Sequence, residues 1–298
     1  MTEANLTALP DTLGSAKFLG HFVNQSEEWH YLRSLGIGGS DISAIVGVNP
    51  WQSSYNLAAT RLGKIPNTFE PSEAMEWGTR LESAILDKFQ DNHPDLKLHR
   101  EVGSWCNVER PFQQANPDAI FEQDGEYGII EVKTARYEDD WRDGVPAYYK
   151  TQVQWYLHTF GFSKAHVAVL FSGSKYKEFE IEADVFEQGL NLDAATHFWG
   201  LICNGELPDF SQPFLSTYTA TREMHPDIED AEVELGQLGI EYSNAVSKAN
   251  DAESDLNHMR ARVLDAMGKA KKGTIDGDVV VTRQARSGGT PYLVQKRK

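Results

Sequence analysis

Two carboxylates between residues 116 and 133 have the spacing to hold a cation between neighbouring strands. The stretch reads NPDAIFEQDGEYGIIEVK, and its Asp124-Gly125 pair between two β-type runs predicts a two-residue hairpin turn. Paired residue numbers then add up to 249, which puts Asp118 opposite Glu131. Two carboxylates about 4 Å apart repel each other by about 4 kcal/mol at an effective dielectric of about 20, unless something positive lies between them.

Lys133 lies two residues beyond Glu131, and side chains two apart share one face of a strand. A hard cation bound by Asp118 and Glu131, with Lys133 beside it, would remove the repulsion and create a reactive centre. The alternative is a surface hairpin with a simple salt bridge between Glu131 and Lys133. Two side chains from other elements favour the reactive centre.

Glu82 and Gln152 are these side chains. On the helix expected at 72–91, Glu82 belongs to an apolar line that steps by three and four residues, which predicts a buried carboxylate. A buried acid is costly unless it is paired, protonated or near a metal, and the alternative is a salt bridge to Arg80 or Arg61. Gln152 flanks the seam of the helix after the hairpin, where it could bond a phosphate, a water or a carbonyl. The line around Glu82 comprises Met75, Gly78, Ile85 and Phe89.

Together, three acids, a lysine and a glutamine suit the metal-dependent hydrolysis of a phosphodiester. A divalent ion lowers the pKa of a bound water, while a lysine orients that water or stabilises charge developing on phosphorus. Mg²⁺ suits an all-oxygen site better than Zn²⁺, since the nine histidines show neither HxxxH nor HxH spacing. A serine nucleophile is not supported, because the sequence has no GxSxG elbow.

The elements that must position these residues alternate between helical and β-type patterns. Helices are expected at 26–35, 41–46, 54–62, 72–91 and 184–203, with another beginning near Pro146. Strands are expected at 98–106, 115–123, 127–135, 165–172 and 177–183. We therefore expect a mixed α/β core over residues 25–224, preceded by a loosely ordered lead-in at 1–24.

Residues 225–298 are expected to form a separate appendage. Apolar residues from Ile228 to Ala266 repeat in alternating steps of three and four, which is the heptad pattern of a coiled coil. A short hairpin and a basic tail follow. This segment could fold back on the core, dock a partner or mediate self-association.

Charge is unevenly distributed along the chain. Its 298 residues include 28 basic and 44 acidic side chains, a net charge of −16. Up to Gly268 the net charge is −22, from 20 basic and 42 acidic residues, whereas the remainder carries +6. An acidic body disfavours non-specific binding to nucleic acid, so DNA would have to meet a locally basic surface.

The chain shows no pattern of a membrane or secretory segment. No apolar run reaches the roughly 18 residues that span a bilayer, and the amino terminus lacks the basic and apolar regions of a signal peptide. A cytoplasmic location is therefore expected. The two cysteines, Cys106 and Cys203, are too few for a disulfide framework, an iron–sulfur cluster or a structural zinc site.

The proline and aspartate at 117–118, followed by Glu131-Val132-Lys133, resemble the PD-(D/E)xK nuclease signature. With RSLGIGGSD (33–41), WGTRLE (77–82), NPDAIF (116–121), EVKTA (131–135) and QVQWYLHTFG (152–161), about residues 28–205 resemble the lambda-exonuclease-like branch, the YqaJ-type viral recombinases. The resemblance implies a restriction-endonuclease-like α/β (α+β) fold with a mixed central sheet flanked by helices. It also implies a phage-encoded, Mg²⁺-dependent 5′→3′ exonuclease that resects double-stranded DNA ends for homologous recombination by single-strand annealing.

The resemblance also assigns roles to individual residues. The implied metal ligands are Asp118, Glu131 and the carbonyl of Val132, with Mn²⁺ expected to substitute for Mg²⁺. Lys133 is the implied catalytic lysine, and Glu82 and Gln152 are the implied supporting residues around metal and water.

A second pocket is implied around Arg33 and Ser40, which match family positions that hold the 5′-phosphate. Independently, a Gly-Gly-Ser turn that opens a helix suits an anion, because free backbone N–H groups point outward there. The alternative is an ordinary capped turn. Asn116 departs from the family pattern, because it stands where the lambda-type enzyme has serine.

Family members that act processively form rings around DNA and cooperate with a single-strand annealing protein, so a trimer and such a partner are expectations from the resemblance. Three alternatives remain. The protein could be an endonuclease of the same fold, a Cas4-like processing nuclease, or a non-catalytic module that binds DNA ends through its carboxy-terminal segment. Cas4-type proteins normally need four cysteines, whereas two are present here.

Overall fold

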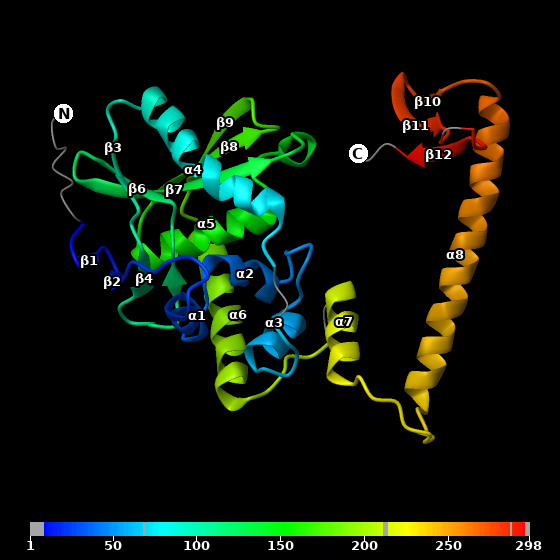
Figure 1. Cartoon of the computed structure of the whole chain (residues 1–298), viewed down its shortest axis with the longest axis horizontal. Helices are drawn as coiled ribbons and strands as arrows, with labels where there is room; N and C mark the ends of the chain where they lie inside the picture. The colour runs from blue at the N-terminus through cyan, green and yellow to red at the C-terminus, as the bar shows by residue number, and fades with distance from the viewer. Residues whose placement is uncertain (1–8, 68–69, 211–213, 287, 296–298) are drawn as a thin grey trace. The chain divides into compact units, whose positions relative to one another are not determined.

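The computed structural model describes residues 9–67, 70–210, 214–286 and 288–295 (Figure 1). Contacts within the chain divide it into two compact units, Met1–Asp227 and Ile228–Lys298. Each unit is described separately below. None of the helices in these described ranges combines the length and the apolar character needed to cross a membrane.

A five-stranded sheet forms the centre of the first unit. Its strand order is β3-β6-β7-β8-β9, and every neighbouring pair is antiparallel except β7 and β8, which are parallel. The expected mixed central sheet is thus confirmed. The strands are β3 (Lys97–Arg100), β6 (Ala119–Gln123), β7 (Glu126–Ala135), β8 (Lys164–Phe171) and β9 (Lys175–Glu182).

The register of the hairpin β6–β7 is the one that the turn predicts. Pairs run from Gln123–Glu126 to Ala119–Ile130, so their numbers add up to 249. Asp124 and Gly125 have φ angles of 54° and 85°, the double left-handed geometry of a tight hairpin.

Helices cover both faces of this sheet (Figure 1). On one face, α4 (Glu73–Asn92) packs Ile85 and Phe89 against Ile130 of β7. On the other face, α5 (Ala147–Phe160) packs Val153 and Leu157 in a cluster that includes Ile129. Because side chains alternate along a strand, the odd-numbered residues of β7 face α5. The helix α6 (Val185–Asn204) follows β9.

The amino-terminal segment differs from the expected loosely ordered lead-in. Residues 1–8 lie outside the described part, but β1 (Thr12–Leu13) and β2 (Ala16–Gly20) join a second sheet of order β1-β2-β4-β5. Ala16 is fully buried in the core, and the Ser15 amide donates to the Phe160 carbonyl over 2.8 Å. These contacts are with chain far away in sequence, which the local pattern did not reveal.

Two predicted strands are each divided in the structure. The strand expected at 98–106 is two strands, β3, which ends at Arg100, and β4 (Ser104–Asn107). The chain turns between them because Glu101 and Gly103 adopt left-handed φ angles of 52° and 71°. Similarly, β5 (Gln114–Ala115) is separated from β6 by residues 116–118. Asp118 therefore lies just outside the hairpin ladder.

Several short helical elements complete the first unit. They are α1 (Glu27–Ser34), α2 (Gly39–Ile45), α3 (Ser54–Arg61), the 3₁₀ turn η1 (Asp139–Trp141) and α7 (Leu215–Met224). The helix expected at 41–46 begins two residues earlier, at Gly39, and its N-cap residue is Gly38. A side chain on Gly39 would come within 2.4 Å of the Tyr156 ring, so glycine allows α2 to lie directly on α5.

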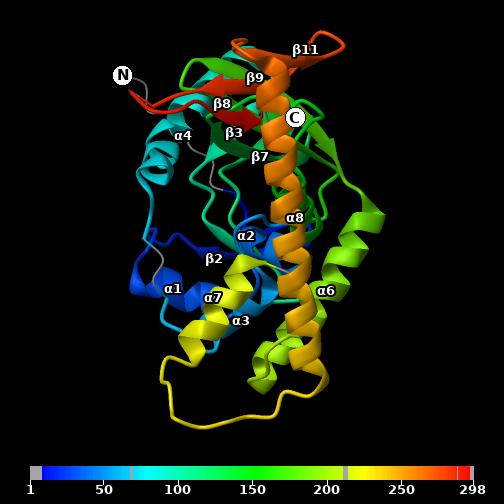
Figure 2. The same ribbon diagram turned by 90° about the vertical axis from the view of Figure 1, so that its right-hand side faces the viewer.

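The second unit contains one long helix and a small sheet (Figures 1 and 2). The helix α8 runs over Gln237–Met267, and the strands β10 (Lys272–Ile275), β11 (Asp278–Gln284) and β12 (Tyr292–Gln295) form an antiparallel sheet. The expected hairpin thus has a third strand. The predicted seam positions before Gly236 lie outside the helix, because α8 begins only after Gly236, whose φ angle of 54° is not helical.

Close packing at Gly128 generates a stability prediction. Gly128 pairs with Phe121, and a Cβ there would lie 2.2 Å from Phe121 Cζ and 2.6 Å from the Lys164 carbonyl oxygen. We expect Gly128→Ala to lower the free energy of unfolding by about 1–3 kcal/mol through overpacking. Urea denaturation measures this. Gly200→Ala in α6 is the matched control, since its Cβ would meet no heavy atom within 4 Å, and it should be neutral or mildly stabilising.

Candidate active site

Glu131 is the centre of the site. It lies in the middle of β7, and its side chain is 3% exposed. Its Oε1 accepts hydrogen bonds from Lys133 Nζ over 2.5 Å and from Gln152 Nε2 over 2.6 Å. The structure therefore joins three of the residues singled out in the sequence, two from β7 and one from α5.

The second carboxylate oxygen of Glu131 has a different environment. Oε2 is buried and has no hydrogen-bond partner among the described residues. Burial, followed by the charge of Asp118, raises the pKa of Glu131 to about 8, although Lys133 acts to lower it. A buried acceptor without a donor is costly, and a cation would satisfy it.

Asp118 is positioned by the backbone of β7. Its Oδ2 accepts a hydrogen bond from the Val132 amide over 2.6 Å. Burial raises the pKa of Asp118, while Lys133 and the bond from Val132 act in the opposite direction. The backbone contact holds this carboxylate beside Glu131, close to the position that the hairpin register predicts.

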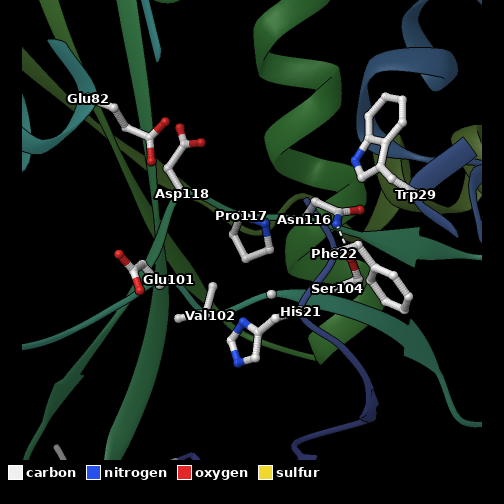
Figure 3. Close-up of a pocket in the computed structure, with 11 residues that line it drawn as sticks. His21, Phe22, Trp29, Glu82, Glu101, Val102, Ser104, Asn116, Pro117 and Asp118 are labelled. Carbon is white, nitrogen blue, oxygen red and sulfur yellow. Dashed lines mark hydrogen bonds between the residues drawn. The ribbon is translucent and has the colours of Figure 1, made fainter. Parts of the chain in front are cut away.

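Glu82 approaches Asp118 from α4, and Figure 3 shows their carboxylates pointing toward each other. Burial, followed by the charge of Asp118, raises the pKa of Glu82 to about 7. Less of the apolar face of α4 is buried than expected, because the Met75 side chain is 50% exposed and the buried residues begin at Ile85. Glu82 therefore lies where α4 leaves the core rather than in the middle of a buried face. Arg61, one expected partner of Glu82, pairs with Asp41 instead.

An open pocket of about 240 Å³ lies beside these two acids (Figure 3). It contains a further acid, Glu101, whose charge also contributes to the raised pKa of Glu82. Sequence reasoning missed Glu101, although the Gly103 that follows it marks a break in the β-type run. Asn116 donates a hydrogen bond to Ser104 on the pocket wall. The other lining residues are His21, Phe22, Trp29, Val102, Gly103, Pro117 and Asp118.

Lys133 remains a cation in this site. Burial acts to lower its pKa, but Glu131 and Asp118 outweigh burial, and the pKa is raised. Its Nζ also lies 4.8 Å from the centroid of the Tyr149 ring, a cation–π contact. The ammonium group is thus held by a carboxylate and an aromatic ring.

The residues fit a divalent cation in their donor chemistry. The buried Glu131 Oε2 and the Asp118 carboxylate supply hard oxygen ligands, and burial with mutual repulsion disfavours their charged forms without a cation. Within the described ranges, no group of three or more His, Cys, Asp or Glu side chains is arranged as a metal site. The expected set contains two carboxylates, Asp118 and Glu131, and the Val132 carbonyl, and all three remain predicted ligands.

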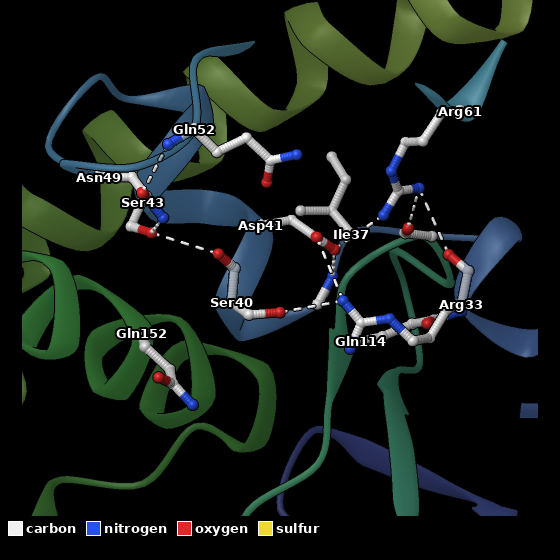
Figure 4. A network of polar contacts seen from close by, with 12 residues as sticks. Arg33, Ile37, Ser40, Asp41, Ser43, Asn49, Gln52, Arg61, Gln114 and Gln152 are labelled. Carbon is white, nitrogen blue, oxygen red and sulfur yellow. Dashed lines mark hydrogen bonds and ion pairs between the residues drawn. The ribbon is translucent and has the colours of Figure 1, made fainter. Parts of the chain in front are cut away.

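A second polar cluster contains Arg33 and Ser40 (Figure 4). Arg33 Nη2 donates to Ser40 Oγ over 3.0 Å and to Asp41 Oδ1 over 3.2 Å. Asp41 Oδ2 accepts from Arg61 Nη2 over 2.7 Å and from the Gly38 amide over 2.9 Å. The Gly38 N–H expected to face an anion is therefore bonded within the chain, and the exposed groups are Ser40 and part of Arg33.

Asp41 and Arg61 belong to this cluster, although the sequence analysis did not assign them to it. Burial acts to raise the pKa of Asp41, but Arg61 and Arg33 outweigh it and the pKa is lowered. One carboxylate thus pairs with two guanidinium groups, which leaves a net positive charge in the cluster. The RSLGIGGSD block contained Asp41, yet only the folded chain brings Arg61 from α3 to it.

The two clusters are neighbours through α5. A Cβ on Gly39 would come within 2.9 Å of Gln152 Cγ, so the start of α2 touches the residue that bonds Glu131. Figure 4 shows Gln152 on α5 beside the turn that carries Ser40. A substrate group at Arg33 would therefore lie near the carboxylates.

Comparison with known proteins identifies related sequences. Residues 28–163 match the family model of the YqaJ-like viral recombinase domain. The YqaJ protein of Bacillus subtilis (strain 168) is 34% identical over 188 residues, which cover 61% of this chain and 58% of that protein. Protein D345L of African swine fever virus (strain Badajoz 1971 Vero-adapted) is 24% identical over 158 residues, 44% of each chain. The chain thus spans about half the length of these relatives.

Solved structures share the fold of the first unit. The alkaline exonuclease LHK-Exo of Laribacter hongkongensis matches with a TM-score of 0.50 and 19% identity over 60% of this chain and 93% of that one. Its complex with dAMP matches with a TM-score of 0.51 and 20% identity over the same shares, 60% and 93%. These matches support the expected fold class.

The raised pKa of Glu131 predicts how stability depends on pH. The folded protein without metal keeps a proton on Glu131 up to about pH 8, whereas an unperturbed glutamate loses it near 4.5. The folded state binds more protons in this window, so the free energy of unfolding falls as pH rises through it. We expect Glu131→Gln to reduce this fall, measured as the melting temperature between pH 5 and 8.5 in EDTA.

Glu126→Gln is the matched control for this measurement, because Glu126 is an exposed carboxyl on the same strand. It should leave the slope of the wild-type protein unchanged. A Glu131→Gln protein with the full wild-type slope would contradict the assignment of the proton to Glu131.

Proposed function

Because residues 28–163 match the family model of the YqaJ-like viral recombinase domain, we propose that this chain is a Mg²⁺-dependent 5′→3′ exonuclease that resects double-stranded DNA ends. The observation that carries the proposal is the buried Glu131 carboxylate. One of its oxygens is bonded to Lys133 and Gln152, and the other has no hydrogen-bond partner in the part of the chain that the structure describes. The alkaline exonuclease with the same fold adds support. We assign the activity to residues 25–224.

In this proposal Asp118, Glu131 and the Val132 carbonyl hold Mg²⁺, and Mn²⁺ substitutes for it. The bound ion supplies a water of lowered pKa and neutralises charge on the phosphate. Lys133 keeps its proton and lies on the face of β7 that carries Glu131, where its ammonium group stabilises the charge that develops on phosphorus.

The supporting residues act through contacts already described. Gln152 and Lys133 orient the Glu131 carboxylate from two sides, so that its other oxygen stays available. Glu82 adds a third carboxylate next to Asp118. With its pKa raised to about 7, Glu82 can hold or release a proton near neutral pH.

The polarity follows from the second cluster. Arg33 and Ser40 bind the 5′-phosphate, since a guanidinium and a hydroxyl at hydrogen-bond distance from each other both suit a phosphate. Asp41 and Arg61 hold Arg33 in place from the buried side. A 5′ end bound there lies next to Gln152, and hence near the metal ligands.

The biological role is recombination of the phage type, in the cytoplasm of a bacterium or a phage-infected cell. Resection exposes a single strand, which an annealing protein then pairs with its complement. A ring of three copies around the duplex would keep the enzyme on its substrate. The match to the YqaJ-like viral recombinase domain supports this role.

Digestion of linear and covalently closed circular duplexes in Mg²⁺ tests the activity. We expect the wild-type protein to degrade the linear DNA and to spare the circle, because it needs an end. Lys133→Ala should lower the rate by at least about 100-fold, the usual effect of removing a group that stabilises transition-state charge. Lys150→Ala, which removes a partly exposed ion pair between Lys150 of α5 and Glu187 of α6, should digest at the wild-type rate.

Two outcomes would reject this function. A cut circle indicates an endonuclease. A protein that leaves both substrates intact and gains no thermal stability from Mg²⁺ has a vestigial site, since a ligand that binds the folded state must stabilise it.

End-labelled duplexes with 5′-phosphate or 5′-hydroxyl ends test the Arg33 pocket. The wild-type protein should prefer the phosphorylated end and release label from the 5′ side. We expect Arg33→Ala to lose about tenfold of this preference, the equivalent of one charge-assisted bond of about 1.4 kcal/mol. Arg142→Ala, an exposed arginine in a pair with Asp139, is the control. Equal preference in the wild-type protein and Arg33→Ala would remove Arg33 from the site.

A further inference from the structure

The long helix α8 exposes an apolar line along its length. Every residue from 240 to 262 is exposed, and the large side chains Tyr242, Leu256 and Met259 are 69%, 48% and 46% exposed. These residues, with Ala245, Ala249 and Ala252 between them, are spaced alternately by three and four. A narrow line with this spacing is the seam of a coiled coil, which is stable only against another helix.

The charge of the second unit reverses from one end to the other. Residues 228–255 contain eight acidic side chains and one basic side chain, whereas residues 256–298 contain ten basic and three acidic side chains. Most of this reversal lies outside α8, because residues 228–236 carry four acidic side chains and residues 268–298 carry eight basic and two acidic ones. A parallel pair of α8 would place flanking segments of like charge at the same end, whereas an antiparallel pair would place segments of opposite charge there. At physiological ionic strength screening sets in at about 8 Å, so charges across a helix pair still interact.

We propose that α8 forms an antiparallel coiled coil with α8 of a second copy of this chain. The register that keeps both seams in contact has its two-fold axis between residues 250 and 251. Tyr242 then faces the partner's Met259, and Leu256 faces the partner's Ala245. In this seam alanine meets alanine only where Ala249 faces the partner's Ala252, whereas a parallel pair would place alanine on alanine in three layers.

The positions beside the seam fit this register. In an antiparallel pair the residues that precede Tyr242, Ala249, Leu256 and Val263 face one another. Glu241 consequently faces Arg262 of the partner subunit, and Lys248 faces Asp255 of the partner subunit, so each symmetric dimer contains four attractive contacts. A parallel pair in register would place Glu241 opposite the partner's Val246 and Arg262 opposite the partner's Met267.

Charge reversal at these positions separates the two arrangements. Sedimentation velocity of the full-length protein gives the dissociation constant of the association step, and Glu241→Lys and Arg262→Glu should each raise it about tenfold, because attraction becomes repulsion at two symmetric contacts. The double variant Glu241→Lys/Arg262→Glu should restore it to within about twofold. Arg260→Glu is the matched control, since in the antiparallel register Arg260 lies opposite the partner's Gly239.

The same experiment can overturn the proposal. A parallel coil would leave Glu241→Lys neutral and make Arg260→Glu damaging, because Arg260 would then lose the partner's Asp255. A wild-type protein that stays monomeric at 100 µM would reject the pairing of α8. An association that no reversal changes would also reject it, because the copies would then associate through another surface, such as that of the proposed ring of three. Melting temperature and digestion of linear DNA in all variants report whether they fold, and the association measurement stands whether or not the protein degrades DNA.

Discussion

The burial of the Glu131 carboxylate is the constraint on which the rest of the first unit depends. A glutamate in the middle of a central strand destabilises the sheet unless donors or a cation surround it. Lys133 on the same strand and Gln152 on the covering helix supply donors to one oxygen only. The fold therefore keeps a polar centre between two apolar layers, and α5 must lie where Gln152 can reach it.

The parallel pair of β7 and β8 determines where α5 lies. Parallel neighbours need a crossover, and α5 is that crossover between the end of β7 and the start of β8. Its path brings Gln152 over Glu131 and Tyr149 over Lys133. The next contact on α5 is Gly39 of α2, so one helix connects the acidic centre with the Arg33 cluster. The proposed metal site and the proposed phosphate pocket are thus both packed against the same helix, α5.

The net charge of −16 is compatible with the proposed DNA substrate because charge is arranged locally. Glu82, Asp118 and Glu131 are best counted together with a bound cation, which removes much of their repulsion for a phosphate. Beside them, two arginines share one carboxylate, Asp41, and retain a positive charge near the surface. Charge is also unevenly distributed in the second unit, where acidic side chains predominate in residues 228–255 and basic side chains in residues 256–298.

The sequence by itself determined the hairpin register, the shared face of Glu131 and Lys133, the mixed sheet and the heptad spacing within α8. These features follow from turn chemistry and from periodicity, which act over a few residues. Tertiary structure decided the rest: the strands near Ala16, the pairing of Arg61 with Asp41, the position of Glu101, and the edge position of Glu82 on a helix half exposed to solvent. Each of these depends on segments distant in the chain, whose burial and hydrogen bonds exist only once the layers have packed.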